Sequence, residues 1–405
     1  MRRNSDVPMA VIHRHYLDLC GFPPARPAHD AHSAGRGLWW TLDPWLRGLR
    51  VVARNCAHHP RRLRQLHQVP RFIAEFRVDP NAYYRYGLYR DWKRRARYMF
   101  HDEIVAVLND INERMSAVDA DILFDKRAFL RRCREARLPA IPILAEFEAG
   151  VGRDVGQHDP SQHSDLFSKF ANRYCGEGAA QWTYERGRYR NGNALVTLSD
   201  LKALLASQST RFPIILQPRV VNHGDLAPVS GNGLSTVRII TIRNPGEAPQ
   251  VALACYRMPT GQSVADNFAA GGIAAGVNLD TGVLGPGAMK ADSSVRVRRH
   301  PDSGASIEGR SLPHWRKACD LAIEAHRAFA SMVSVGWDVA ITAGGPILVE
   351  GNAVWCVDLA QMSSGKPLAD SPIPACLSQY LESAPVAEHA RLARNDVQLD
   401  LSGRP

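Results

Sequence analysis

The chain has no apolar run as long as a bilayer-spanning helix and no two cysteines spaced as CxxC. A membrane span of about 20 apolar residues is therefore not expected, and neither is a zinc site or a thioredoxin-like redox motif. The eight cysteines are scattered along 405 residues, which is usual for reduced thiols. The basic N-terminus lacks the apolar segment of a signal peptide. These absences favour a cytoplasmic globular protein.

Two glycine-rich phosphate-binding patterns are also missing. The chain contains no Walker A sequence and no GxGxxG after a first strand, which excludes the common P-loop and dinucleotide-binding sites. Residues 81–100 interleave basic residues with Tyr and Trp, an arrangement able to stack on bases. No motif of a known nucleic-acid-binding module accompanies them. We therefore expect no nucleic acid partner.

Positive charge is concentrated at the N-terminal end. Residues 1–100 carry 19 Lys and Arg against 7 Asp and Glu, whereas the rest of the chain is close to neutral. The spacing of apolar residues predicts helices over 44–55 and 60–76. Such a basic helical segment is typical of a solvated face, but also of a surface for nucleic acid, an anionic membrane or an anionic partner.

The stretch Ser334–Asn352 predicts two short strands joined by a turn at residues 342–346. Asp338 lies within the first strand, and Glu350 and Asn352 end the second. Since side chains alternate between the two faces of a strand, Glu350 and Asn352 share one face, and a hairpin brings Asp338 opposite them. Such oxygen ligands suit Mg²⁺ bound together with substrate phosphates. A polar-ended hairpin without a metal is the alternative.

The pattern predicts further strands at 214–221, 235–243 and 250–258, a helix at 313–332 and a loop at 290–313. Asp125 is placed to cap a helix that starts at Lys126. Lys169 leads into a turn with Gly176 and Gly178, whose backbone N–H groups can face phosphates.

Cations and oxygen ligands thus recur along a mostly antiparallel sheet. Cations neutralise a polyphosphate, and oxygen ligands bridge it through a metal, as an acyl- or phosphoryl-activating site requires. The residues concerned are Lys126, Lys169, Arg238, Arg257, Asp338, Glu350 and Asn352.

Their order resembles that of ATP-grasp proteins, most closely the sugar-transfer-associated ATP-grasp family and more distantly the ribosomal-protein-S6 glutamate-ligase type. The resemblance lies in LSTVRIITIR (234–243), YRMPTGQSVADNFAAGGIAAGVNLDTGVLG (256–285) and VGWDVAITAGGPILVEGN (335–352), and it covers about residues 80–370. It implies an α+β ATP-grasp fold, in which two α/β subdomains clasp ATP. The expected parts are a basic helical extension (1–100), a lid part (101–215), a catalytic part (216–370) and a C-terminal helix and tail (371–405).

The resemblance also implies roles on the nucleotide side. Lys126 would contact the α-phosphate, Lys169 would reach the nucleotide from the opposite strand, and Gly176 and Gly178 would form a loop over the phosphates. A hinge at residues 217–220 would read adenine through its backbone.

Within that hinge, Gln217 and Val220 would contact the nucleotide. Beyond the hinge, Asp225 would hold the ribose hydroxyls. Lys169 is followed by Phe170, where many relatives have Pro. Pro218 stands where Glu is usual in the family, so adenine would be read by the backbone alone.

On the acceptor side, Arg238 and Arg257 would face the γ-phosphate and the carboxylate under attack, and Asn267 would shape the acceptor pocket. Several ligases have a reactive-centre Arg two residues before the metal-binding Asp. Here that position is Gly336, so Arg238 or Arg257 would take its role. One or two Mg²⁺ or Mn²⁺ ions would be bound by Asp338, Glu350 and Asn352.

The activity implied is ATP- and Mg²⁺-dependent ligation of a carboxylate to an amine through an acyl phosphate. The expected partners are ATP and small-molecule carboxylate and amine substrates. Two alternatives stay open at this point. One is an ATP-grasp kinase acting on a small-molecule hydroxyl or carboxylate, and the other is a non-catalytic nucleotide-binding scaffold.

Overall fold

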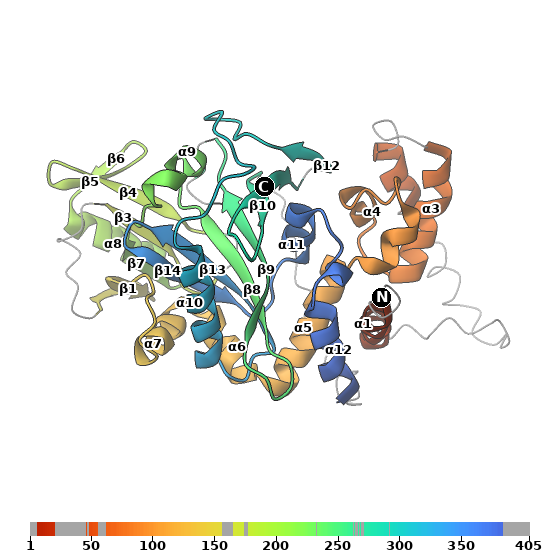
Figure 1. Ribbon diagram of the computed structural model, residues 1–405. Helices are drawn as coiled ribbons and strands as arrows, with labels where there is room; N and C mark the ends of the chain where they lie inside the picture. The colour runs from red at the N-terminus through yellow and green to blue at the C-terminus, as the bar shows by residue number, and fades with distance from the viewer. Residues whose placement is uncertain are drawn as a thin grey trace. The chain divides into compact units, whose positions relative to one another are not determined.

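The computed structural model describes residues 6–20, 46, 48–55, 62–155, 165–173, 177–231, 233–261, 263, 266, 268, 271–290 and 292–383. The chain divides into two compact units, one formed by residues 1–111 with 367–405 and the other by residues 112–366. Described elements of the first unit are helical, and the second unit carries two sheets (Figure 1). No helix in these ranges is both long and apolar enough to cross a membrane.

The first unit joins helices from both ends of the sequence. α1 packs against α12, and the buried Nε2 of His15 lies 2.8 Å from Asp110 Oδ2 on α5. Arg97 donates to Asp370 over 2.7 Å. Besides a helix over residues 48–55, its elements are α1 (Asp6–Leu19), α3 (Arg62–Phe76), α4 (Asn81–Arg85), η1 (Trp92–Arg97), α5 (His101–Met115), η5 (Leu368–Asp370) and α12 (Ile373–Ser383).

The first sheet of the second unit is antiparallel, in the order β2-β1-β7-β3-β4-β5-β6. Residues 182–190, whose sequence predicts one continuous strand of a hairpin, belong instead to two strands that are joined by a turn at Arg186-Gly187. The strands are β1 (Ala145–Glu148), β2 (Val151–Asp154), β3 (Leu166–Phe170), β4 (Ala180–Glu185), β5 (Arg188–Asn191), β6 (Ala194–Val196) and β7 (Ile214–Pro218).

Two helices of the second unit begin at side-chain caps. α8 (Leu198–Gln208) packs on the sheet and starts at a capping box made by Thr197 and Asp200. α6 (Ala117–Phe124) precedes α7 (Lys126–Glu135). The carboxylate of Asp125 accepts a hydrogen bond from Arg127 N at 2.8 Å, which confirms the predicted cap. The cap fixes Lys126 as the first residue of α7.

The second sheet is also antiparallel, in the order β12-β11-β10-β9-β8-β13-β14. The expected loop at 290–313 is wrong, because residues 292–297 pair with β11. The first half of this edge strand is polar, and Val295 and Val297 alone are too short an alternation to predict it. The strands are β8 (Thr236–Ile242), β9 (Gln250–Met258), β10 (Ile273–Val277), β11 (Leu284–Met289), β12 (Asp292–Val297), β13 (Ser334–Thr342) and β14 (Gly345–Asn352).

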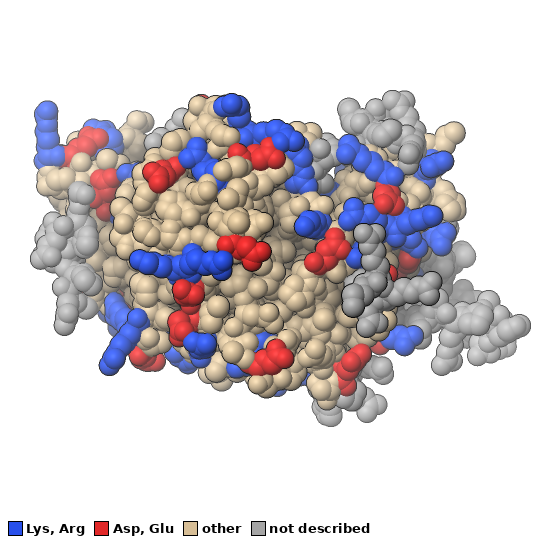
Figure 2. Space-filling view, viewed as in Figure 1, with Lys and Arg blue, Asp and Glu red and all other residues tan. Residues whose placement is uncertain are grey.

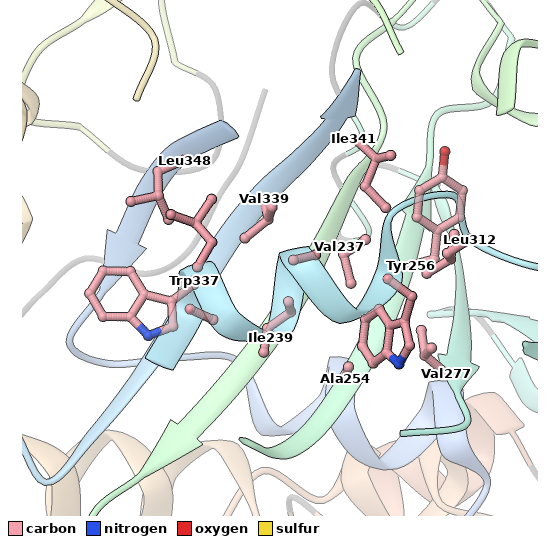
Figure 3. Packing of buried hydrophobic residues seen from close by; sticks show 14 of the residues in the cluster. Val237, Ile239, Ala254, Tyr256, Val277, Leu312, Trp337, Val339, Ile341 and Leu348 are labelled. Atoms are coloured by element: carbon pink, nitrogen blue, oxygen red, sulfur yellow. The ribbon is translucent and has the colours of Figure 1, made fainter. Parts of the chain in front are cut away.

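One face of this second sheet forms the main core of the unit. Alternate residues of β8 and β13, such as Val237 and Trp337, are fully buried and pack under α10 (Trp315–Ala328). Figure 3 shows these side chains gathered between the strands and a helix. Since side chains alternate along a strand, the residues between them point to the other face. The short elements η3 (Gly224–Leu226), α9 (Ala227–Ser230) and α11 (Val357–Ser364) complete the unit.

Candidate active site

Charged residues on three neighbouring strands lie in one row across the second sheet. Arg238 of β8 is paired with Asp338 of β13, which is paired with Glu350 of β14. This confirms that the hairpin places Asp338 opposite Glu350. The pairing depends on a bulge, because an uninterrupted ladder from the Thr342–Gly345 pair would put Val349 there. The register shifts between Asp338 and Val339, and bulges of this kind re-aim side chains near functional sites.

Asp338 is held by two guanidinium groups. Its Oδ1 lies 2.5 Å from Nε of Arg238 and its Oδ2 lies 3.0 Å from Nη2 of the same residue. Nη2 of Arg257 lies 2.9 Å from Oδ2. Only 1% of Asp338 is exposed. Burial alone would raise the pKa of this carboxyl, but the two arginines outweigh it and lower the pKa to about 2.

Asp266 extends this network on the far side of Arg257. Its Oδ1 lies 3.2 Å from Arg257 Nη2, and its Oδ2 accepts from the backbone N and Oγ1 of Thr236 at 2.7 and 2.6 Å. Burial raises the pKa of Asp266, against the opposing charge of Arg257. Asp266 was not among the residues expected from the sequence. Its only signal was its place beside Asn267, which lies outside the described residues.

The two predicted lysines approach the same row. Lys126 Nζ lies 3.8 Å from Glu350 Oε2 and donates to the carbonyl of Arg173 at 2.8 Å. Lys169 of β3 belongs to the other sheet and is buried. Burial, reinforced by the charge of Lys126 and opposed by that of Glu350, lowers the pKa of Lys169 to about 8. The fold therefore brings lysines from two segments to the acid-bearing hairpin.

The turn after β3 requires glycine at position 178. Gly178 has φ +68°, and a Cβ there would lie 2.7 Å from the ring of Phe170. Both facts exclude an ordinary side chain. Phe170 therefore packs over the turn that follows Lys169. Gly176 lies outside the described residues, and its role stays a prediction.

The hinge residues lie on and just after β7. Gln217 is paired with Phe167 of β3, and its Nε2 donates to the carbonyl of Ile141 at 3.2 Å. Val220 follows the end of β7. The side chain of Asp225, further along the chain, is 74% exposed. No contact joins these three to the charged row within the described ranges, so their predicted nucleotide contacts stay predictions.

The donor set on the hairpin fits a hard cation. Asn352 lies opposite Gly336 and donates from Nδ2 to the carbonyl of Gly336 at 3.1 Å, which leaves its Oδ1 as an oxygen that could bind a metal. Glu350 is paired with Asp338, and its side chain is 29% exposed. The described residues contain no group of three His, Cys, Asp or Glu that could hold a metal alone. Substrate phosphates would therefore complete the coordination.

Position 336 is small because a neighbouring strand fills its space. A Cβ on Gly336 would lie 3.2 Å from Cδ of Arg238 and 2.8 Å from Cβ of Trp355. The side chain of Arg238 thus runs past Gly336 to reach Asp338. Arg238, rather than a residue of β13 itself, is therefore the arginine beside Asp338, the carboxylate that the sequence predicts to bind a metal.

Comparison with known families gives one match. Residues 110–372 match the family described as "Sugar-transfer associated ATP-grasp", which is more than half of the 405 residues. No curated protein matches the chain.

Solved structures give more distant similarities. The D-alanine–D-alanine ligase from Coxiella burnetii is 12% identical with a TM-score of 0.39, over 71% of this chain and 68% of that one. The corresponding ligase from Bacillus anthracis is 12% identical with a TM-score of 0.36, over 66% and 68%. The ATP-grasp ligase PsnB, complexed with minimal precursor, Mg and ADP, is 14% identical with a TM-score of 0.36, over 73% of each chain.

Proposed function

Because the chain belongs to the sugar-transfer associated ATP-grasp family, we propose that it is an ATP- and Mg²⁺-dependent ligase that joins a carboxylate to an amine. One observation carries the proposal. Arg257, Asp338 and Arg238 lie side by side on one sheet face, Asp266 contacts Arg257 from a loop, and lysines from two other segments reach the same row. Such preorganised charge stabilises phosphoryl and acyl transfer.

The charges of the site support a polyanionic substrate that arrives with cations. Four cationic side chains (Lys126, Lys169, Arg238 and Arg257) face three carboxylates (Asp266, Asp338 and Glu350). The excess of one positive charge is far too small to neutralise a triphosphate. When bound, Mg²⁺ or Mn²⁺ would supply the missing charge, held by Asp338, Glu350 and Asn352.

In the proposed first step, a carboxylate oxygen of the substrate attacks the γ-phosphorus of ATP. The bond from that phosphorus to the β,γ-bridging oxygen breaks, giving an acyl phosphate and ADP. Lys126 and Lys169 would bind the phosphates, and Arg238 and Arg257 would orient the carboxylate and stabilise the charge that develops. No covalent bond to the protein is needed.

In the second step, the amine nitrogen attacks the acyl carbon. The bond from that carbon to the phosphate oxygen breaks, so phosphate leaves and an amide forms, while the amine loses a proton. Burial of the row around Asp338 keeps water away from the reactive acyl phosphate.

We place this reaction in the cytoplasm, which the free cysteines in the described ranges support.

Trapping the acyl phosphate tests the proposal without knowledge of the natural amine. The protein is incubated with ATP, Mg²⁺, a panel of carboxylic acids and hydroxylamine, and ADP and hydroxamate are measured. We expect both products with at least one acid and their loss in Glu350→Gln. Glu247→Gln, an exposed carboxylate that only accepts from Asn244, is the matched control and should retain activity.

The other outcomes distinguish the alternatives. ADP with a phosphorylated product but no hydroxamate would instead indicate a kinase. ATP binding without ADP release for every acid would indicate a nucleotide-binding scaffold and overturn the ligase proposal.

A further inference from the structure

A stretch of the first unit is basic without any acidic residue. Residues 44–74 contain seven arginines and no Asp or Glu. They include the helix over residues 48–55 and most of α3. A run of this kind carries a positive potential that its own sequence does not neutralise. None of the chemistry proposed for the second unit uses it.

The two helices of this stretch are neighbours, and each presents an exposed face. A Cβ on Gly48 would lie 3.2 Å from Cδ1 of Ile73 and 3.3 Å from Pro70, so the helices pack closely there. Side chains turned away from this packing are exposed. We name these exposed residues the basic-leucine face: Leu46, Leu49, Arg50, Arg54, Leu63, Arg64, Leu66 and Arg71.

The leucines of the basic-leucine face are unusually accessible. Leu63 is 83% exposed, and Leu46, Leu49 and Leu66 are 45 to 50% exposed. Scattered exposed leucines are common on protein surfaces. Four of them on two adjoining helices, each interleaved with arginine, form a pattern that favours a binding surface.

The arginines of this face differ from others in the same unit. Arg85 is paired with Asp79 and Arg95 with Glu75. Within the described ranges, Arg50, Arg54, Arg64 and Arg71 are exposed and form no ion pair. In the space-filling view, Lys and Arg side chains gather over the region of α3 and α4 (Figure 2). Unpaired guanidinium groups fit a partner that carries negative charge.

We propose that the basic-leucine face binds the interfacial region of an anionic lipid bilayer. Guanidinium groups bind headgroup phosphates bidentately, and leucines insert at the level where the acyl chains begin. Long arginine side chains extend from a partly immersed helix to the headgroups. A nucleic acid or a free polysaccharide would satisfy the arginines but leave the four leucines in water. The bilayer interface accommodates both kinds of side chain.

Vesicle co-sedimentation of the full chain tests this inference. Vesicles of phosphatidylglycerol and phosphatidylcholine in equal amounts should bind the protein, and vesicles of phosphatidylcholine alone should bind it much more weakly. Changing Arg50, Arg54, Arg64 and Arg71 to Gln should weaken binding about fivefold for each arginine. Changing Leu49 and Leu63 to Gln should weaken it about tenfold for each leucine.

Matched variants and a soluble polyanion complete the experiment. Arg186→Gln with Arg188→Gln, two exposed residues in the β4–β5 turn and at the start of β5, should leave vesicle binding unchanged, and all variants should show wild-type thermal unfolding. Failure to bind anionic vesicles would overturn the inference. So would binding that the leucine changes do not affect and that heparin reproduces, since that result indicates a purely electrostatic surface. ADP formation is scored separately, so failure of the ligase proposal is a different result.

Discussion

The two faces of the second sheet are built from the same strands and have opposite properties. On β13, Trp337 and Val339 point into the core, whereas Asp338 between them points to the charged row. The core face tolerates apolar substitutions of similar volume. The charged face is stable only while each buried charge keeps its partner. Stability and chemistry are therefore one residue apart along the same strand.

The core face gives the largest expected effect on stability. Trp337 is fully buried, and its Nε1 donates to Thr241 Oγ1 at 2.8 Å. Trp337→Ala should lower the free energy of unfolding by about 4 kcal/mol, because it leaves a large cavity and removes the hydrogen bond to Thr241. Urea denaturation measures this change. Leu195→Ala, on an exposed position of β6, should change it by less than about 0.5 kcal/mol, and a similar loss for both variants would contradict the contrast.

On the charged face, removing one partner should cost nearly as much. Asp338→Ala leaves Arg238 buried without its carboxylate and should lower the free energy of unfolding by about 3 kcal/mol. The double variant Arg238→Met, Asp338→Leu should recover most of that stability, because neither charge remains. It should still form no ADP. Recovery of activity in the double variant would show that the pair is structural only.

Acid should weaken the charged face selectively. The pKa of Asp338 is lowered from 3.8 to about 2, so its stabilising contribution is present above pH 4 and is lost as the pH falls toward 2. The corresponding contribution to the free energy of unfolding is on the order of 2 kcal/mol. Unfolding free energies of the wild type and Asp338→Asn, measured between pH 5 and 2 (about the range of both pKa values), should converge. Parallel curves would refute this assignment.

The smallest effect is expected at Gly336 of β13, which the side chain of Arg238 from β8 passes closely. Gly336→Ala would bring a methyl group against Arg238 and Trp355, at an overpacking cost of about 1–2 kcal/mol. ADP formation should fall by more than this loss of stability explains, because Arg238 must move. Gly344→Ala, whose Cβ would meet Thr342 Oγ1 at an ordinary 3.7 Å, is the control. Equal activity in the two variants would exclude a role for the position of Arg238.

Local patterns in the sequence revealed much of this arrangement. Alternation along residues 345–352 was enough to place Glu350 and Asn352 on one face, and the Asp125 cap fixed where Lys126 starts its helix. The edge strand at 292–297 was not predicted because only Val295 and Val297 alternate with polar residues, which is too short a pattern to indicate a strand. Asp266 was not predicted as a site residue because its partner Thr236 is 30 residues away. Nothing near either residue signals that pair.

The amino-acid sequence by itself determined which residue types alternate along each strand, because that pattern depends only on the period of two in an extended backbone. The tertiary structure alone decided the register. The bulge at Val349 sets Glu350 opposite Asp338, and the pairing of β8 with β13 brings in Arg238 across 100 residues. It also joined α12 to α1. Register and partners follow from long-range packing and charge neutralisation, which no local pattern encodes.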